Sequence, residues 1–180
     1  MIDDSPRRSH VQLGHADHVP SGHTFPLSLL AQDVTDPANI GSLFRLADAL
    51  GVRHLYLTGN SATPDNPKVR RAARAAQQAV AWSYRRDSLA LVRELKTRNA
   101  WVVSLEITSN SEDVRLVRPP SDREIVLVVG AENAGVCQTL LDESERVVHI
   151  PMRGMNSSMN LAVASALAVF EMTRQLTLGG

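Results

Sequence analysis

The sequence contains few of the residues that mark secreted, membrane-bound or aromatic-rich proteins. It has one cysteine, Cys137, so no disulfide can form within the chain, which suits a reducing compartment. No apolar run approaches the ~20 residues of a membrane span, and residues 1–18 lack the apolar segment of a signal peptide. We therefore expect a cytoplasmic protein without membrane contact. Aromatic residues make up 4% of the chain, so its core must be aliphatic and rich in alanine.

The chain also lacks an excess of charge of either sign. Its 19 basic and 19 acidic residues cancel, whereas nucleic-acid-binding proteins usually carry a basic excess. The distribution is uneven, because no acidic residue stands between Asp65 and Asp87. That interval holds six cations, which are Lys68, Arg70, Arg71, Arg74, Arg85 and Arg86.

This basic interval is a candidate RNA-binding surface. In the helix expected from Asn66, Arg70, Arg71 and Arg74 share one face, and apolar residues through Val80 form the opposite face. Solvated helix faces usually mix charges of both signs, and RNA phosphates attract clustered cations. We predict that Lys68 and the three arginines bind RNA phosphates, and an ordinary solvated helix face is the alternative.

Length and periodicity predict one α/β domain. The 180 residues fit one domain, and 43% of them are hydrophobic, which is enough for a sizeable core. Apolar runs predict strands at 26–32, 54–59, 79–84, 100–106, 124–130 and 146–151. Helical spacing predicts helices at 40–50, from 66, at 88–97 and at 160–175. This alternation indicates a parallel sheet covered on both faces. Residues 1–24 are polar, and we expect a mobile arm there ahead of a domain at 25–178.

Three segments place turns rich in polar residues and glycine beside apolar runs. They are DPANIGSLFRLADALG at 36–51, IVLVVGAENAGV at 125–136 and IPMRGMNSSMNLAVA at 150–164. A turn between a strand and a helix exposes backbone N–H groups, and open α/β sheets bind ligands there. Together the segments supply eight candidate site residues: Asn39, Gly41, Arg45, Gly130, Glu132, Gly135, Ser158 and Asn160.

The order N-x-G-x-x-x-R, G-x-E-x-x-G and I-P-M-x-G-x-x-x-S-[L/M]-N resembles the three motifs of the SpoU-type RNA 2′-O-ribose methyltransferases of the SPOUT class. The resemblance covers about residues 25 to 175, with Met159 where the family usually has Leu and Ala162 where it often has Ser. It implies a single-domain, parallel-sheet α/β knot with a deep C-terminal trefoil knot, which the residues alone could not predict. It also implies a homodimer. Small residues on the last helix would then let two backbones approach closely: Ala162, Ala164, Ala166 and Ala168.

The resemblance further implies S-adenosylmethionine as the cofactor. It places that cofactor at Leu105, Gly130 and Ile150, whose backbone groups would bracket the adenosine, with Met159 packed on the ring. The residues themselves argue against nicotinamide or flavin cofactors, because Glu132 stands where the dinucleotide fingerprint needs a glycine beside the pyrophosphate. The alternative is a tight turn with Glu132 in the first turn of a helix.

The resemblance assigns the reaction to five residues, which are Asn39, Arg45, Glu132, Ser158 and Asn160. The pKa of an arginine lies above ~12, so we expect Arg45 to orient a phosphate and stabilise a developing alkoxide. The residues alone leave alternatives open, because Arg45 could be a solvated surface residue and Asn39 or Ser158 could cap a helix. No hydrolase triad is apparent. We predict no metal site, since four unevenly spaced histidines in residues 1–24 are not typical ligands.

The predicted function is an RNA 2′-O-ribose methyltransferase. The residues before 25 are too few for the extra RNA-binding domain that family members acting on large ribosomal RNA often carry, so we favour transfer RNA over ribosomal RNA. The alternatives are an RNA-binding module of the same fold that has lost catalysis and, less compatible with Glu132, a nicotinamide-dependent oxidoreductase.

Overall fold

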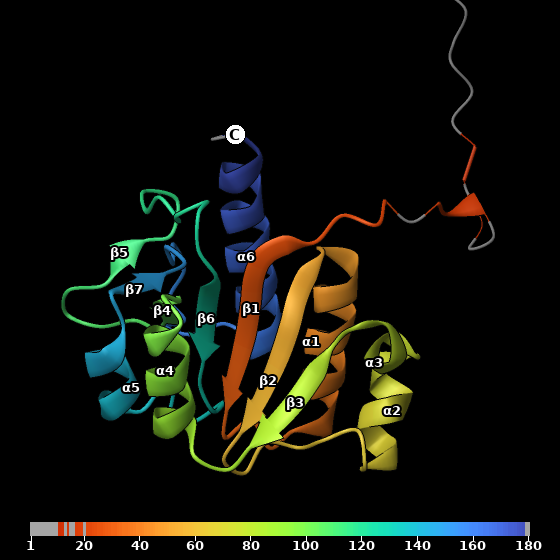
Figure 1. Cartoon of the computed structure of the whole chain (residues 1–180), viewed down its shortest axis with the longest axis horizontal. Helices are drawn as coiled ribbons and strands as arrows, with labels where there is room; N and C mark the ends of the chain where they lie inside the picture. Colours follow the sequence, from red (N-terminus) through yellow and green to blue (C-terminus); the bar gives the residue numbers. More distant parts are fainter. Residues whose placement is uncertain (1–10, 13, 15–16, 20, 179–180) are drawn as a thin grey trace, which may run out of the picture.

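The fold is a twisted seven-stranded parallel sheet with helices on both faces (Figure 1). The computed structural model describes residues 11, 12, 14, 17–19 and 21–178, so most of the predicted arm at 1–24 lies outside the described residues. The strands are β1 (Phe25–Gln32), β2 (Val52–Thr58), β3 (Trp82–Arg85), β4 (Trp101–Leu105), β5 (Glu112–Asp113), β6 (Ile125–Val129) and β7 (Arg146–His149). The helices are α1 (Pro37–Ala49), α2 (Pro67–Ala73), α3 (Ala76–Ala79), α4 (Ser88–Thr97), α5 (Gln138–Glu143) and α6 (Leu161–Leu178).

The strands lie in the order β3-β2-β1-β6-β4-β7-β5, and every pair is parallel. The predicted parallel α/β architecture is therefore confirmed. Two late strands occupy interior positions, because β6 pairs between β1 and β4, and β7 pairs between β4 and β5. The short strand β5 and the helix α5 were not predicted, since neither contains an apolar run long enough to show a period.

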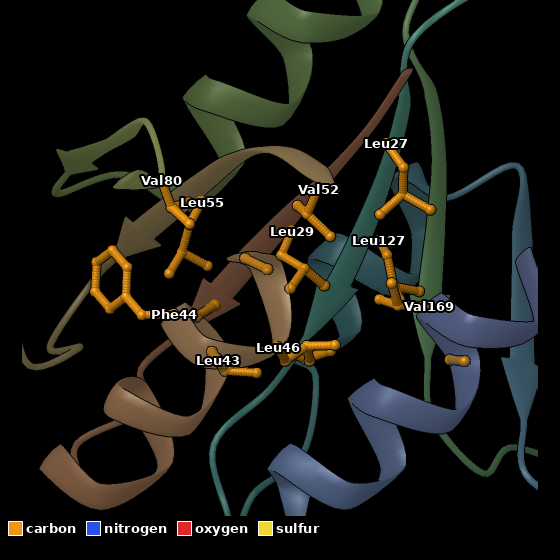
Figure 2. Packing of buried hydrophobic residues seen from close by; sticks show 14 of the residues in the cluster. Leu27, Leu29, Leu43, Phe44, Leu46, Val52, Leu55, Val80, Leu127 and Val169 are labelled. Carbon is orange, nitrogen blue, oxygen red and sulfur yellow. The ribbon is translucent and has the colours of Figure 1, made fainter. Parts of the chain in front are cut away.

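Aliphatic side chains fill both faces of the sheet, as the scarcity of aromatics predicts. On one face, α1 and α6 pack over a large cluster that includes Leu29, Phe44, Leu127 and Val169 (Figure 2). On the other face, α4 and α5 cover a smaller cluster around Leu30, Val92, Val128 and Leu140. Central strands buried on both sides must be apolar throughout, which explains the run IVLVV in β6.

Helices α1 and α2 approach each other closely at Gly41. A Cβ atom at Gly41 would lie 2.3 Å from the Cβ of Ala72 and 2.8 Å from its carbonyl carbon. This glycine of the first motif is buried. Its role in the structure is to let two helices pack.

The prediction of one continuous basic helix from Asn66 to Val80 is wrong. Helix α2 ends at Ala73, because Arg74 and Ala75 have positive φ angles of 50° and 71°. A left-handed residue ends an α-helix, and α3 starts a new direction. The strand predicted at 79–84 is correspondingly shifted, since Ala79 belongs to α3 and β3 starts at Trp82.

Helix α6 is long and apolar enough, by length and composition alone, to cross a membrane. In this structure its inner face packs against α1 and β1 through residues that include Ala168, Val169 and Met172. The predicted packing role of its alanines is wrong at Ala168, which is fully buried in the core of its own chain. Larger side chains form the outer face: Val163, Leu167 and Phe170 are exposed.

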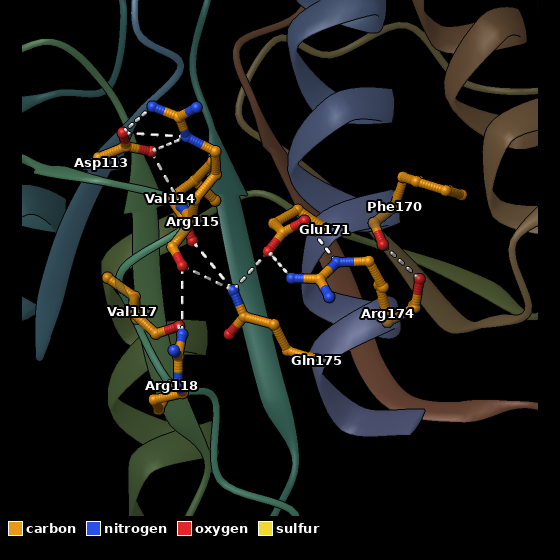
Figure 3. A network of polar contacts seen from close by, with 10 residues as sticks. Asp113, Val114, Arg115, Val117, Arg118, Phe170, Glu171, Arg174 and Gln175 are labelled. Carbon is orange, nitrogen blue, oxygen red and sulfur yellow. Dashed lines mark hydrogen bonds and ion pairs between the residues drawn. The ribbon is translucent and has the colours of Figure 1, made fainter. Parts of the chain in front are cut away.

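A polar network fastens α6 to the loop after β5 (Figure 3). Gln175 Nε2 donates to the carbonyl oxygen of Arg115 at 3.3 Å, and Arg174 donates twice to Glu171 at 2.7 and 2.9 Å. Hydrogen bonds from Arg174 and then Gln175 lower the pKa of Glu171 to about 2. A hydrogen bond from Arg115 likewise lowers the pKa of Asp113 to about 2.

Candidate active site

Three neighbouring strands end where the candidate cofactor residues stand. Strand β4 lies between β6 and β7, so the carboxyl ends of these strands lie side by side. Leu105 is the last residue of β4, Gly130 follows β6, and Ile150 follows β7. Parallel strands present their carboxyl ends at one edge, and α/β sheets bind ligands in the crevice beside it. The sheet thus brings these three predicted residues together.

The turn after β6 has no room for a larger residue at either glycine. A Cβ at Gly130 would lie 2.0 Å from the carbonyl carbon of Gly135. Gly135 has a φ of +66°, and its Cβ would lie 2.2 Å from Oε2 of Glu106. Both glycines are therefore required by the turn itself, whether or not a ligand approaches it.

Glu106 is a site residue that sequence reasoning missed. Its Oε2 accepts a hydrogen bond from the backbone N–H of Val136 at 3.0 Å, and its Oε1 accepts from the N–H of Ile107 at 2.8 Å. On the other side of the turn, Gln32 Oε1 accepts from the N–H of Cys137 at 3.0 Å. The turn after β6 is thus held from both β4 and β1. The available signal was a charged residue directly after an apolar strand, next to Leu105.

Asn39, Glu132 and Asn160 form one hydrogen-bonded chain that joins all three motifs. Asn39 Nδ2 donates to Glu132 Oε1 at 2.8 Å, and Asn160 Nδ2 donates to Asn39 Oδ1 at 3.1 Å. Asn39 is buried, whereas Glu132 and Asn160 are exposed. This hydrogen-bonded network therefore has a fixed centre at Asn39, and its two ends, Glu132 and Asn160, face the solvent from which a substrate would approach.

Two alternative interpretations of these residues are wrong. Asn39 does not cap α1, because the side chain of Asp36 accepts the N–H of Ala38 at 2.9 Å and takes that role. Glu132 does not lie in a helical turn, because α5 begins only at Gln138.

Asn160, and not Ser158, caps helix α6. Asn160 Oδ1 accepts hydrogen bonds from the N–H groups of Ala162 and Val163 at 3.0 and 3.2 Å. Ser158 is exposed, and its side chain makes no hydrogen bond to Glu132 or to any other described residue. Its predicted role would require a ligand or partner to reach it.

The segment 150–159 offers unpaired backbone groups next to this network. Among the described residues, none makes a backbone–backbone hydrogen bond to this segment. A Cβ at Gly154 would meet nothing within 4 Å, and Met159 is 37% exposed. Free N–H and C=O groups beside an exposed thioether suit a ligand with an adenine and ribose hydroxyls. The residues present therefore fit S-adenosylmethionine, which Leu105, Gly130, Ile150 and Met159 would hold.

Arg45 is exposed on α1, one turn after Gly41. Within the part of the chain that the structure describes, its guanidinium makes no hydrogen bond and no ion pair. A guanidinium that is not committed to a carboxylate is available to a phosphate.

The basic surface is exposed, but its residues differ in what they contact. Lys68, Arg71 and Arg74 are exposed, and their side chains form no hydrogen bond with the described residues. Arg70 instead donates to the carbonyl oxygens of Pro64 at 2.6 Å and Asp65 at 2.9 Å. Arg70 therefore also holds the loop before α2. Because Arg74 is left-handed, it does not share a helical face with the others.

Metal binding receives no support from the described residues. No group of three or more His, Cys, Asp or Glu side chains there could hold a metal ion. Of the histidines noted at the amino end, His10 and His15 lie outside the described residues, and His23 contacts Phe25 edge-on at 4.6 Å. Cys137 is exposed at the start of α5.

The family model for the SpoU rRNA Methylase family matches residues 26–170. The chain belongs to this family. The match contains all three motifs, and it confirms the resemblance drawn from them.

Relatives and solved structures agree with this membership. The 23S rRNA (guanosine-2′-O-)-methyltransferase RlmB of Ralstonia nicotianae is 33% identical over 150 residues, which is 83% of this chain and 59% of that protein. The chain thus spans about 59% of this curated relative. The SpoU methyltransferase AviRb of Streptomyces viridochromogenes, in complex with the cofactor AdoMet, aligns with a TM-score of 0.76 and 26% identity, over 89% of this chain and 64% of AviRb. A structure concerned with the 2-OH methylation of C/U34 on tRNA aligns with a TM-score of 0.73 and 31% identity, over 84% of this chain and 96% of that one.

Proposed function

We propose that this member of the SpoU family transfers a methyl group from S-adenosylmethionine to a ribose 2′-hydroxyl of RNA. The observation that carries the proposal is the hydrogen-bonded network Glu132–Asn39–Asn160, centred on Asn39, which unites the three motifs at the carboxyl end of the sheet. Such an enzyme acts mainly by holding the methyl donor and the ribose hydroxyl in the right relative position, without a covalent intermediate. S-adenosylmethionine brings the methyl group on a sulfonium that is already a good leaving group.

Side chains at the carboxyl end of the sheet would position the RNA for this transfer. Arg45 would bind the phosphate next to the target ribose and stabilise the charge that develops on the 2′-oxygen. Asn39 is buried and bonded on both sides, so it would hold Glu132 and Asn160 rather than touch the RNA. Ser158 and the exposed ends of the network would contact the ribose. The proton of the 2′-hydroxyl would leave to water or through Arg45.

We propose transfer RNA as the substrate class. The solved structure concerned with the 2-OH methylation of C/U34 on tRNA supports this choice, since it aligns with the chain at 31% identity and a TM-score of 0.73. The direct test is methyl transfer from labelled S-adenosylmethionine to deproteinised tRNA and to 23S rRNA, followed by mapping of ribose methylation. Transfer to tRNA is expected. Transfer to 23S rRNA alone would reassign the substrate, and RNA binding without any transfer would favour a catalytically inactive RNA-binding module.

We propose that Lys68, Arg71 and Arg74 bind the RNA backbone, with a smaller share from Arg70. Replacing Lys68, Arg71 and Arg74 by Gln should lower the slope of log K against log salt by roughly 2–3, because fewer counterions leave the RNA when fewer of its phosphates are bound. Replacing Arg70 alone should also loosen the loop that it holds at Pro64. An unchanged slope would identify a solvated face.

We propose a homodimer that buries the outer face of α6. Val163, Leu167 and Phe170 are exposed at helical spacing and form an apolar stripe. A cavity of about 280 Å³ continues this stripe toward Ile150 and Pro151. A second copy seated there would cover the stripe and border the candidate site. Light scattering should give a dimer for the wild type and a monomer for Leu167→Glu, and a monomeric wild type would contradict the proposal.

We also propose the deep trefoil knot that the family resemblance implies. The positions of β6 and β7 between earlier strands support it, because the chain returns late to the interior of the sheet. Knots are rare exceptions to ordinary topology. A crystal structure traced through residues 106–160 checks whether the segment after β7 passes through the loop before β6, and an unthreaded path would contradict the proposal.

A further inference from the structure

Tyr84 is an exposed aromatic residue that the proposed site does not use. All seven tryptophan, tyrosine and phenylalanine residues lie in the described part of the chain, and two of them are exposed. Phe170 belongs to the α6 stripe, and Tyr84 is 42% exposed near the end of the edge strand β3. An aromatic ring left in solvent at the edge of a sheet is a candidate contact surface.

The ring of Tyr84 is held in place by neighbouring strands. Its hydroxyl donates to the carbonyl oxygen of Gly59 at 2.8 Å. Gly59 has a φ of +64°, and its Cβ would lie 2.2 Å from Oδ1 of Asp33. That same Asp33 oxygen accepts the N–H of Asn60 at 2.8 Å. The turn after β2 is thus anchored on the end of β1, and Tyr84 is anchored on that turn.

Two arginines stand next to this ring in the sequence. Arg85 and Arg86 follow it directly and are exposed, and neither forms an ion pair with a described residue. The nearest acid in sequence, Asp87, is already engaged, because its side chain accepts the N–H of Ala90 at the start of α4. Since side chains alternate along a strand, Arg85 lies on the face opposite Tyr84, and Arg86 follows the end of β3.

Tyr84 lies near the carboxyl end of its strand, and the candidate site lies at the same end of the sheet. The carboxyl ends of β1, β2, β3 and β6 point in one direction in Figure 1. Three strand spacings separate β3 from β6, which places the end of β3 about 15 Å from the turn at Gly130. An RNA strand lying along this edge would reach both places.

We propose that Tyr84 is a stacking platform for an unpaired RNA base, with Arg85 and Arg86 beside the flanking phosphates. The inference rests on the proposed function, since it gives that function's RNA a second point of contact. Bases in a duplex hide their faces, whereas unpaired bases stack on exposed aromatic rings. The preferred substrate therefore has an unpaired nucleotide in the same loop as the methylated ribose, a short distance along the strand.

The test uses the full chain and an RNA hairpin whose unpaired loop carries one 2-aminopurine, a base whose fluorescence falls when it stacks. The wild type should quench this fluorescence. Tyr84→Leu keeps the apolar bulk without the ring, so it should lose the quench, bind the hairpin roughly 5- to 150-fold more weakly and raise KM rather than lower kcat. Tyr84→Phe keeps the ring and should restore most of the quench. A fully paired RNA of the same length should bind the wild type and Tyr84→Leu equally.

Two results would overturn the inference: a full quench in folded Tyr84→Leu, or an equal loss of affinity for hairpin and duplex. Photo-crosslinking of the wild type to a loop with 5-iodouridine gives an independent check, and a crosslink that does not map to Tyr84 counts against the proposal. The same experiment distinguishes failure of this inference from failure of the proposed function. If the wild type quenches the fluorescence but transfers no methyl group, the stacking site stands and the proposed enzymatic function is wrong. If it methylates RNA without quenching, the enzymatic function stands and the stacking site is wrong.

Discussion

The side-chain amide of Asn39 lies 2.8 Å from Oε1 of Glu132, across 93 residues of sequence. This contact joins the first turn of α1 to the turn after β6, and the oxygen of the same amide receives a hydrogen bond from Asn160. A buried amide that is bonded on both sides fixes the relative positions of the segments it joins.

We expect Asn39 and Glu132 to be energetically coupled. Asn39→Ala and Glu132→Ala should each lower the free energy of unfolding, and the double variant should lose less than the sum, with a coupling of about 0.5–1.5 kcal/mol. Urea unfolding of the four proteins measures this. Asn133→Ala, in the same exposed turn, is the matched control and should show no coupling. Strict additivity would mean that the contact contributes nothing.

Arg45→Ala should reduce methyl transfer more than tenfold, which corresponds to ~1.4 kcal/mol of transition-state stabilisation. Affinity for S-adenosylmethionine, measured by calorimetry, should stay nearly constant, because Arg45 lies on α1 and not on the three turns. Arg45→Lys should rescue poorly, since an ammonium lacks the planar fork that binds phosphate. Arg53→Ala, an exposed arginine on β2, is the control. Activity within tenfold of the wild type would identify Arg45 as a surface residue.

Glu106→Ala should loosen the turn after β6. The change leaves the N–H groups of Val136 and Ile107 without their acceptor, at a cost of about 1–3 kcal/mol. Hydrogen exchange at the Val136 amide should accelerate, and affinity for S-adenosylmethionine should fall. Glu112→Ala removes an exposed carboxylate that, among the residues the structure describes, pairs with Arg146 alone, so it should change neither. Unaltered exchange at Val136 would show that the turn holds itself.

The tight packing of the turn after β6 makes substitutions at Gly130 unsuitable as a test of cofactor binding. Gly130→Val would add bulk where the cofactor is expected, yet its side chain would collide with the backbone of Gly135 before it met any ligand. Loss of binding in that variant would therefore report a broken turn. The Glu106 variants avoid this problem because they remove atoms instead of adding them.

Gly41→Ala should destabilise the protein although alanine is the better helix former. The added Cβ would lie 2.3 Å from the Cβ of Ala72, and overpacking of this kind typically costs about 1–3 kcal/mol. Gly154→Ala adds the same atom in open space and should be close to neutral. Chemical denaturation compares the two. Equal stabilities would mean that α1 and α2 separate without cost.

Glu171 should make stability depend on pH in the acid range. Its pKa falls from 4.5 to about 2 in the folded protein, so its contribution is complete above pH 4.5 and is lost as the pH falls toward 2. Glu171→Gln should therefore be less stable than the wild type at pH 7, by about 0.5–1 kcal/mol for a pair near the surface, and equal to it near pH 2. Thermal unfolding across this range checks the effect. Asp122→Asn, which removes an exposed carboxylate without a pair, should not show it.

Local sequence was sufficient for most elements of this fold. Strand β6 and helices α1, α4 and α6 follow from apolar patterns and from end signals such as Gly51, because those signals act between residues that are neighbours in the chain. The start of α1 at Pro37, three residues before the predicted one, was missed. The motif order likewise identified the family without any coordinates. Strand order, by contrast, depends on contacts between distant segments, and no local period reports it.

Tertiary contacts also decided what the candidate residues do. Asn39 had the sequence context of a helix cap, and only the approach of Glu132 made it the centre of a network. Arg74 had the spacing of a helical face, yet the packing of α2 and α3 turned it left-handed. Glu106 carried no periodic signal, and its role exists because β4 and β6 are neighbours in the sheet. The sequence alone therefore determined the elements and the chemistry available at their ends, whereas the folded sheet decided which ends meet, because hydrogen bonds and close packing act over a few ångströms of space regardless of separation along the chain.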